Sequence, residues 1–413
     1  MVGEGSRRAP YVTALAATVV SGLLTYVFLA LVSRSLTAAA FDDFSVFWSL
    51  SLLVGFGLFV PLEQELARDR RGGDQARGVH ETLAVGLLLS GVAVIVLTVL
   101  AGSGVVQLPP AILWIAIGLA LLSPLQYTAK GHLVQQDRIV LHSVTTVVEN
   151  VVRTGIAAVA FLMALSSGRG DDAGLASLAV AIALVTAYVW VLLPALRRPR
   201  LSLRGTVSRV RVVLAILVPS LAGQVLLNSG PLVIDALVDA AGSTGAFQAT
   251  FNLARLPLLV VLPLQAVLIG RMAPLVRAGR VQELTTALSQ FAVAVLGVAL
   301  LGAALGWLVG PFFVELLFGP GRSLPPAGVA LLIAAVCIYV GLVINTQALI
   351  VNGRTRSAAY AWLASLAAAA VGFGLGFALE VPLAVALGLL TGALVAWVVS
   401  ILQLRWRTAH SAS

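Results

Sequence analysis

A basic residue stands in the middle of an apolar run at residues 149–159, which read ENVVRTGIAAV. Arg153 lies among valine, isoleucine and alanine, and Glu149 precedes it by about one helical turn. An arginine at the centre of a lipid-spanning helix costs roughly 2.5–3.5 kcal/mol on insertion scales, so such residues usually face a bundle interior or a water-filled cavity. The i,i+4 spacing places both side chains on one helix face, where they partly neutralise each other. The stretch therefore predicts a spanning helix with a polar, inward-facing side.

The composition of the whole chain agrees with a membrane protein. Of 413 residues, 60% are hydrophobic and only 10% are charged, and the mean hydropathy is +1.03. Such values exclude an ordinary soluble globule and a disordered chain. The apolar runs are long and unbroken, which indicates helical spans. The single cysteine, Cys337, excludes an intramolecular disulfide framework.

Twelve segments have about the 20 apolar residues that a helix needs to cross a bilayer. The first follows a short basic stub and has no clear cleavage site, so we expect it to remain as a span. The predicted spans are residues 11–33, 44–66, 80–101, 110–129, 140–165, 174–196, 210–236, 246–270, 284–309, 327–350, 358–378 and 382–403.

The basic residues alternate between the two sides of this arrangement. With the N-terminus inside, 21 of the 26 Lys and Arg residues fall on the cytoplasmic side. Arg34, Arg169 and Arg322 fall outside, and Arg153 and Arg255 lie within spans. An excess of Lys and Arg in cytoplasmic loops is typical of inner-membrane proteins, and both termini are therefore predicted to be cytoplasmic. This distribution, rather than the net charge of +9, argues against a nucleic-acid partner.

The chain divides into two halves of six spans at an arginine-rich connection, residues 197–211. We expect lobes at residues 1–200 and 201–413. Residues 44–50 (FSVFWSL) echo 247–253 (FQATFNL), and residues 133–138 (LVQQDR) echo 349–354 (LIVNGR). Because six is an even number, equivalent spans cross in the same direction. The predicted fold is an all-α membrane protein with two parallel six-helix lobes around a central cavity.

Polar residues recur at helical spacing in the seventh and eighth spans. Gln248, Asn252 and Arg255 follow i, i+4, i+7, which places two amides and a guanidinium on one face. Gln224 and Asn228 form a similar pair in the preceding span. These stripes line a binding cavity on one interpretation, and on the other they hold the bundle together by interhelical hydrogen bonds.

Glycines at a spacing of four mark the last two spans. Gly372 and Gly376 form one GxxxG step, and Gly388 and Gly392 form another. Small residues at this spacing let helix backbones approach closely. We therefore expect the last two spans to pack against each other.

Several stretches together resemble polysaccharide-transporter flippases, the Wzx-like members of the multidrug/oligosaccharidyl-lipid/polysaccharide exporter (MOP) superfamily. The likeness rests on the second-half residues PSL 219–221, Asn228, GAFQATFNLARLP 245–257 and MAPL 272–275, on the outer stretch VSRSL 32–36, and on the inner stretches QQDR 135–138 and NGR 352–354.

The resemblance implies a V-shaped, MATE/MOP-like cavity and alternating access. It implies transfer of a polyprenyl-diphosphate-linked saccharide from the inner to the outer leaflet for cell-surface polysaccharide synthesis, with membrane lipids, a polysaccharide polymerase and glycosyltransferases as partners. A diphosphate needs a cationic partner, and the planar donor fork of arginine suits two phosphate oxygens. Arg153 and Arg255 are the candidates for this clamp and Arg34 for an outer relay. Sugar hydroxyls would bond to Gln224, Asn228, Gln248 and Asn252.

Alternatives remain for the charge balance and for the function. Glu149 is either the counter-ion of Arg153 or a coupling group that binds a proton or sodium. The rival functions are a cation-coupled exporter of organic cations and a non-transporting scaffold for polysaccharide assembly. No catalytic constellation, Walker sequence or Cys–His metal cluster stands out, so we expect no enzymatic activity, no cofactor and no metal.

Overall fold

The computed structural model describes residues 4–68, 75–167, 191–192, 194, 196, 202–258, 278 and 281–410, and these residues form helices joined by short connections with no strand among them. Ten of the described helices are long and apolar enough to cross a membrane. They match ten of the twelve predicted spans. The other two, residues 174–196 and 246–270, lie largely or partly outside the described residues. The prediction of an all-helical membrane protein is confirmed.

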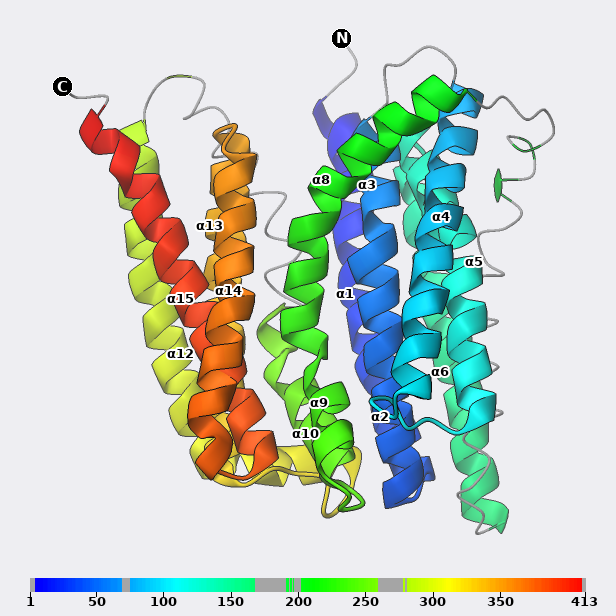
Figure 1. The fold of residues 1–413 in the computed structure, drawn as a ribbon, viewed down its shortest axis with the longest axis vertical. Coiled ribbons are helices and arrows are strands. Elements are labelled where there is room, and N and C mark those ends of the chain that lie inside the picture. Colours follow the sequence, from blue (N-terminus) through cyan, green and yellow to red (C-terminus); the bar gives the residue numbers. More distant parts are fainter. Residues whose placement is uncertain are drawn as a thin grey trace. The chain divides into compact units, whose positions relative to one another are not determined.

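The chain separates into two compact units, Met1–Gln224 and Val225–Ser413. In the first, α1 and α6 run side by side, with α3, α4 and α5 adjoining one another (Figure 1). Its core contains the aromatic rings of Phe28, Phe44 and Trp48, which pack on one another at centroid distances of 5.5–6.1 Å. Its elements are α1 (Glu4–Ser35), α2 (Ala38–Leu52), the π-helix η1 (Leu53–Phe59), α3 (Val60–Arg68), α4 (Gln75–Gly102), α5 (Pro110–Gln135), α6 (Ile139–Ser167) and most of α8 (Leu203–Asn228).

In the second unit, the long helices stand side by side and the short ones lie near one end of them (Figure 1). The short helices are α9 (Gly230–Leu237) and α10 (Ser243–Ala254). The remaining elements are α12 (Val281–Phe318), α13 (Pro326–Val351), α14 (Thr355–Leu375), the 3₁₀ turn η2 (Gly376–Ala378) and α15 (Val381–His410).

The last two spans pack as the glycine spacing predicts. A Cβ atom added to Gly392 of α15 would lie 2.8 Å from the backbone oxygen of Ser365 of α14. One added to Gly388 would lie 2.9 Å from the backbone oxygen of Ala369. Only glycine fits such a distance without a shift of the backbone, so the two helices are in direct main-chain contact.

The predicted seventh span, residues 210–236, is not one helix. It divides into α8 and α9 at Ser229, followed by Gly230 and Pro231. Proline has no backbone N–H and its ring clashes with the carbonyl four residues before it, here that of Leu227. The second predicted span is likewise irregular, since η1 interrupts it before Pro61 and the Val60 N–H donates to the Gly55 carbonyl instead.

The internal echo is visible in the local backbone. At the end of α5, the Arg138 N–H donates to the Leu133 carbonyl at 2.9 Å, and at the end of α13 the Arg354 N–H donates to the Leu349 carbonyl at 2.8 Å. The residue before each arginine, Asp137 and Gly353, has a positive φ. Both helices therefore end in the same Schellman-type cap.

Candidate functional site

The Glu149–Arg153 ion pair expected from the sequence forms within α6. Arg153 Nη2 donates to Glu149 Oε1 at 2.8 Å, and the two residues are only 7% and 4% exposed. Because both charges are buried inside a spanning helix, their mutual attraction is poorly screened. The pair is therefore a fixed feature of the first unit.

A second base reaches the same carboxylate from α5. Lys130 Nζ lies 3.5 Å from Glu149 Oε2, and Gln126 Nε2 donates to that oxygen at 3.3 Å. Lys130, which the predicted topology counted on the cytoplasmic side, lies within α5, because that helix continues to Gln135. Arg153 and Lys130 therefore both contact the Glu149 carboxylate, each at a different oxygen.

Aromatic rings surround these bases. The Arg153 Cζ atom lies 5.9 Å from the Phe28 ring centroid and 5.7 Å from that of Trp48. Lys130 Nζ lies 5.2 Å from the Tyr127 ring centroid. Such cation–π contacts stabilise buried cations by up to about 2 kcal/mol. Arg153 and Lys130 thus lie against aromatic rings as well as beside the Glu149 carboxylate.

Arg255 of the second unit lies beside the end of α8, where the seventh predicted span breaks. Its Nη2 atom donates to the Leu227 carbonyl and to Asn228 Oδ1, each at 2.7 Å. The Leu227 carbonyl needs this donor because Pro231, four residues later, has no N–H. The guanidinium also lies 4.0 Å from the Phe251 ring centroid. As the C-cap of α10, Arg255 is further favoured by the negative end of the helix dipole.

The amides of α10 lie beside this arginine in the sequence and are buried. Gln248 Nε2 donates to Asn252 Oδ1 at 2.8 Å, and the two residues are 1% and 2% exposed. Asn252 Nδ2 has no hydrogen-bond partner among the described residues. A buried donor in this state is rare in proteins and is readily satisfied by a ligand oxygen.

The predicted site residues thus fall into separate groups. Asn228 and Arg255 are in contact, Gln248 bonds to Asn252, and Arg153 pairs with Glu149. Arg34 is exposed in the last turn of α1.

Gln224 lies at the end of the first unit, next to the π-helix. A Cβ atom on Gly57 would lie 3.5 Å from Gln224 Cβ. Close by, Ser220 Oγ donates to the Phe56 carbonyl. Gln224 therefore adjoins an irregular backbone segment, a feature that is frequent at functional sites.

Sequence reasoning missed Gln126, Lys130 and Tyr127. Gln126 and Lys130 are spaced i,i+4 and therefore lie on one helix face. A predicted fourth span that extended beyond residue 129 would have shown this polar stripe. Their approach to Glu149 is a contact between two helices and has no signal in the sequence.

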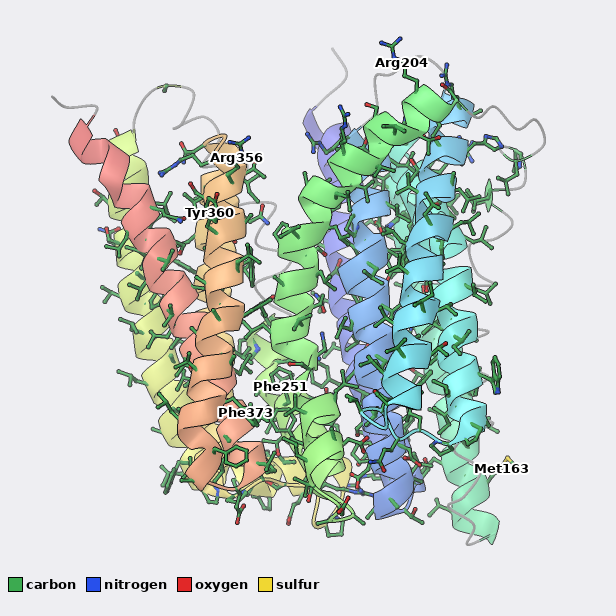
Figure 2. All side chains as sticks on the ribbon, in the orientation of Figure 1. Met163, Arg204, Phe251, Arg356, Tyr360 and Phe373 are labelled. Atoms are coloured by element: carbon green, nitrogen blue, oxygen red, sulfur yellow. The ribbon has the colours of Figure 1, made fainter. Side chains whose placement is uncertain are left out.

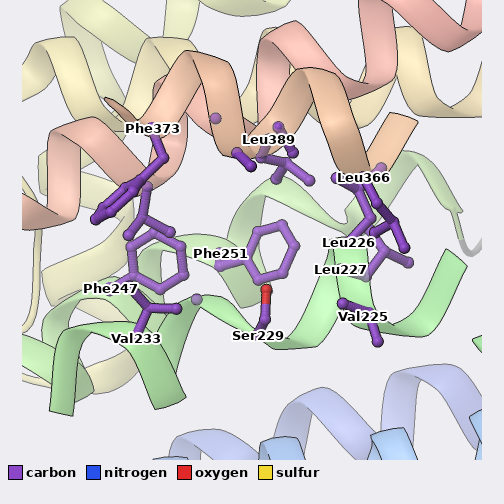
Figure 3. Close-up of a pocket in the computed structure, with 15 residues that line it drawn as sticks. Val225, Leu226, Leu227, Ser229, Val233, Phe247, Phe251, Leu366, Phe373 and Leu389 are labelled. Carbon is purple, nitrogen blue, oxygen red and sulfur yellow. The ribbon is translucent and has the colours of Figure 1, made fainter. Parts of the chain in front are cut away.

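The second unit also contains a cavity of about 320 Å³ (Figure 3), and one of its lining residues, Phe251, contacts Arg255. It is lined by residues of α8, α9, α10, α14 and α15, including Phe251 and Phe373, which are labelled in Figure 2. Among the described residues, no group of three or more His, Cys, Asp or Glu side chains is placed to hold a metal ion.

Ten apolar spans, proline-broken helices and buried bases define an integral multi-pass membrane protein. Solved structures similar in fold are transporters. One is an inward-facing multidrug resistance MATE family transporter of the MOP superfamily, with 15% identity over 97% of this chain and 98% of that one and a TM-score of 0.72. The chain therefore has the two-lobe fold of MATE transporters.

Two further structures have the same fold. A MOP superfamily transporter from Pyrococcus furiosus is 16% identical over 98% of this chain and 96% of its own, with a TM-score of 0.62. A variant of a Vibrio cholerae MATE transporter is 15% identical over 99% and 98%, with a TM-score of 0.56. No protein-family model matches the sequence, and no curated protein is significantly similar to it.

Proposed function

We propose that the protein is a membrane transporter that moves an anionic, lipid-linked saccharide from the inner to the outer leaflet by alternating access. The observation that carries this proposal is the basic character of the polar groups inside the spans. Arg153 and Lys130 both contact the Glu149 carboxylate, and Arg255 donates to the Leu227 carbonyl and to the Asn228 amide oxygen. Charged side chains within a membrane cost free energy to insert, and they usually mark a substrate or ion pathway.

The chemistry of these bases suits a diphosphate. Arginine presents a planar fork of donors that matches two phosphate oxygens, and its charge persists at every physiological pH. In the second unit, the buried amides Gln248 and Asn252 accompany Arg255 on one helix, and amides bond sugar hydroxyls as donors and acceptors. A substrate with a diphosphate and a sugar would satisfy both kinds of group.

The fold also serves a different substrate class, which gives the main alternative. Several transporters of the same fold are described as MATE or multidrug transporters, and Glu149 is a buried carboxylate of the kind that a coupling cation or cationic drug would use. The Pyrococcus furiosus relative is described as having a binding pocket of reverse polarity that suggests a different function. The charge of the pocket is therefore the property to test.

Proteoliposomes containing the purified protein separate these candidates. We expect a fluorescent polyprenyl-diphosphate disaccharide to become accessible in the opposite leaflet, and ethidium, an organic cation, to remain where it is. Ethidium transport without saccharide transfer would overturn the flippase proposal in favour of the cation exporter. Absence of both activities in folded protein would favour the scaffold.

The basic groups are tested in the same assay. Arg255→Gln keeps two amide donors but removes the charge, so we expect saccharide transfer to fall by about tenfold or more, the size of one lost charge-assisted hydrogen bond. Arg356→Gln is the matched control, since Arg356 is exposed on α14 (Figure 2). Equal transfer by both variants, at equal protein level, would show that the Arg255 guanidinium serves packing alone.

A further inference from the structure

The cavity of the second unit is apolar throughout. Its fifteen lining residues include no charged side chain, and Ser229 is the one that carries a hydroxyl (Figure 3). The rings of Phe247 and Phe251 form part of the wall, with centroids 5.8 Å apart. The volume of about 320 Å³ is at the lower end of the roughly 300–1,000 Å³ typical of ligand pockets.

Close packing holds the wall in place. A Cβ atom on Gly230, at the start of α9, would lie 2.4 Å from the Phe247 ring, so the ring packs directly on the backbone. Phe247 and Phe251 are each 1% exposed. The cavity is therefore bounded by side chains that have little freedom to close it.

Two residues line the apolar cavity and also contact Arg255. Phe251 lines the cavity, and the Arg255 guanidinium lies 4.0 Å from the centroid of the same ring. Leu227 also lines the cavity, and its carbonyl accepts the hydrogen bond from Arg255 Nη2. An apolar space and a fixed positive charge are thus adjacent, which is the arrangement that complements an amphiphile with an anionic head.

We propose that this cavity binds the apolar chain of the transported substrate, at the segment nearest its phosphate, while Arg255 binds the phosphate. The inference rests on the proposed function, because it assigns a binding site to the lipid part of the proposed substrate. The volume accommodates only a short stretch of chain, so the remainder of a polyprenyl tail stays among the membrane lipids. A saccharide lacking the chain would lose this contact.

Photolabelling in lipid nanodiscs tests the site directly. The probe is dodecyl phosphate with a diazirine in its chain, and the labelled peptides are mapped by mass spectrometry. Ala370 is exposed on α14 and lines the cavity, whereas Ala367 is exposed on the same helix and does not. Ala370→Trp fills the cavity and Ala367→Trp is its matched control.

We expect the wild type and Ala367→Trp to be labelled on the peptides that carry Phe247, Phe251 and Leu389, and Ala370→Trp to lose at least about four-fifths of that labelling. Arg255→Gln should lower labelling by dodecyl phosphate to the level of the diazirine analogue of dodecanol. Equal labelling of Ala370→Trp and Ala367→Trp would overturn the proposal. So would labelling by a diazirine phosphatidylcholine as efficient as that by dodecyl phosphate, because bulk lipid would then be the occupant.

The two proposals fail in different ways. If wild-type proteoliposomes transfer no saccharide but the cavity is labelled as expected, the proposed transport is wrong and the amphiphile site stands. If saccharide is transferred equally by Ala370→Trp and Ala367→Trp and the cavity is not labelled, transport stands and the chain site is wrong.

Discussion

Glu149 is the acidic residue that contacts both Arg153 and Lys130 in the first unit. Its two carboxylate oxygens face different bases, with Arg153 on Oε1 and Lys130 on Oε2. Removing one partner of a buried ion pair leaves an uncompensated charge, whereas replacing the pair with apolar groups is often neutral. The carboxylate therefore stabilises two like charges that would otherwise repel each other at close range.

Glu149→Gln should accordingly destabilise the protein by about 3–5 kcal/mol, the cost typical of breaking a buried pair. The measurement is the melting temperature in detergent. Glu380→Gln, at an exposed position before α15, is the control and should leave it unchanged. Glu149→Gln combined with Arg153→Met should recover part of the loss, because one of the two like charges is gone. A melting temperature unchanged by Glu149→Gln alone would show that the carboxylate does not hold this cluster.

At the scale of elements, prolines remove backbone hydrogen bonds from the spanning helices, and side chains of other helices donate to the carbonyls left without a helical donor. Pro124 in α5 leaves the Ala120 carbonyl without its helical donor, and Ser90 Oγ of α4 donates to it at 2.7 Å. Pro231 does the same to Leu227, whose carbonyl is taken by Arg255. A broken span thereby fixes a charged side chain at a defined depth, as in transporters with discontinuous helices.

Pro231→Ala tests this link between backbone and side chain. Alanine restores an N–H that competes with Arg255 for the Leu227 carbonyl. We therefore expect Arg255→Gln to destabilise the Pro231→Ala protein less than the wild type, with a coupling energy in the range of about 0.5–3 kcal/mol. Unfolding in denaturant gives the free energies of unfolding of the wild type, the two single variants and the double variant. Pro326→Ala, at the first turn of α13 where proline removes no helical bond, should be additive with Arg255→Gln.

The glycine contact between α14 and α15 gives a second test at this scale. Gly392→Ala would put a Cβ atom 2.8 Å from the Ser365 carbonyl oxygen, and we expect a loss of about 1–3 kcal/mol from overpacking. Gly374→Ala is the matched control, because no atom lies within 4 Å of its new Cβ. It should be neutral or slightly stabilising, since alanine is the better helix former. A Gly392→Ala protein as stable as the control would contradict the close approach of the two helices.

Local patterns of the sequence predicted much of this architecture. The Glu149–Arg153 pair and the GxxxG steps each depend on residues a few positions apart, so spacing alone reveals them, and the echo between residues 133–138 and 349–354 marks two helix ends of the same form. Lys130 and the apolar cavity escaped prediction because they depend on which helices are neighbours. The sequence signals the break at Ser229 by Gly230–Pro231, but the predicted span was based on the length of the hydrophobic run alone.

At the scale of the whole molecule, the distribution of arginines predicts the orientation in the membrane. Arg356 lies in the first turn of α14, Glu380 lies beyond the other end of that helix, directly before α15, and both are exposed. In a Cys337→Ala background, we expect a membrane-impermeant maleimide to label Glu380→Cys in intact cells and Arg356→Cys only after permeabilisation. The reverse pattern would place the termini outside and contradict the positive-inside assignment.

The central claim is that the bases within the spans recognise a negative headgroup. The most direct measurement compares the affinities of the nanodisc-embedded protein for a polyprenyl-diphosphate disaccharide and for the uncharged polyprenyl disaccharide. We predict that the wild type binds the diphosphate at least about tenfold more tightly, equivalent to one charge-assisted hydrogen bond or more, and that Arg255→Gln abolishes most of this preference. Equal affinities for the charged and uncharged ligands in the wild type would contradict the account.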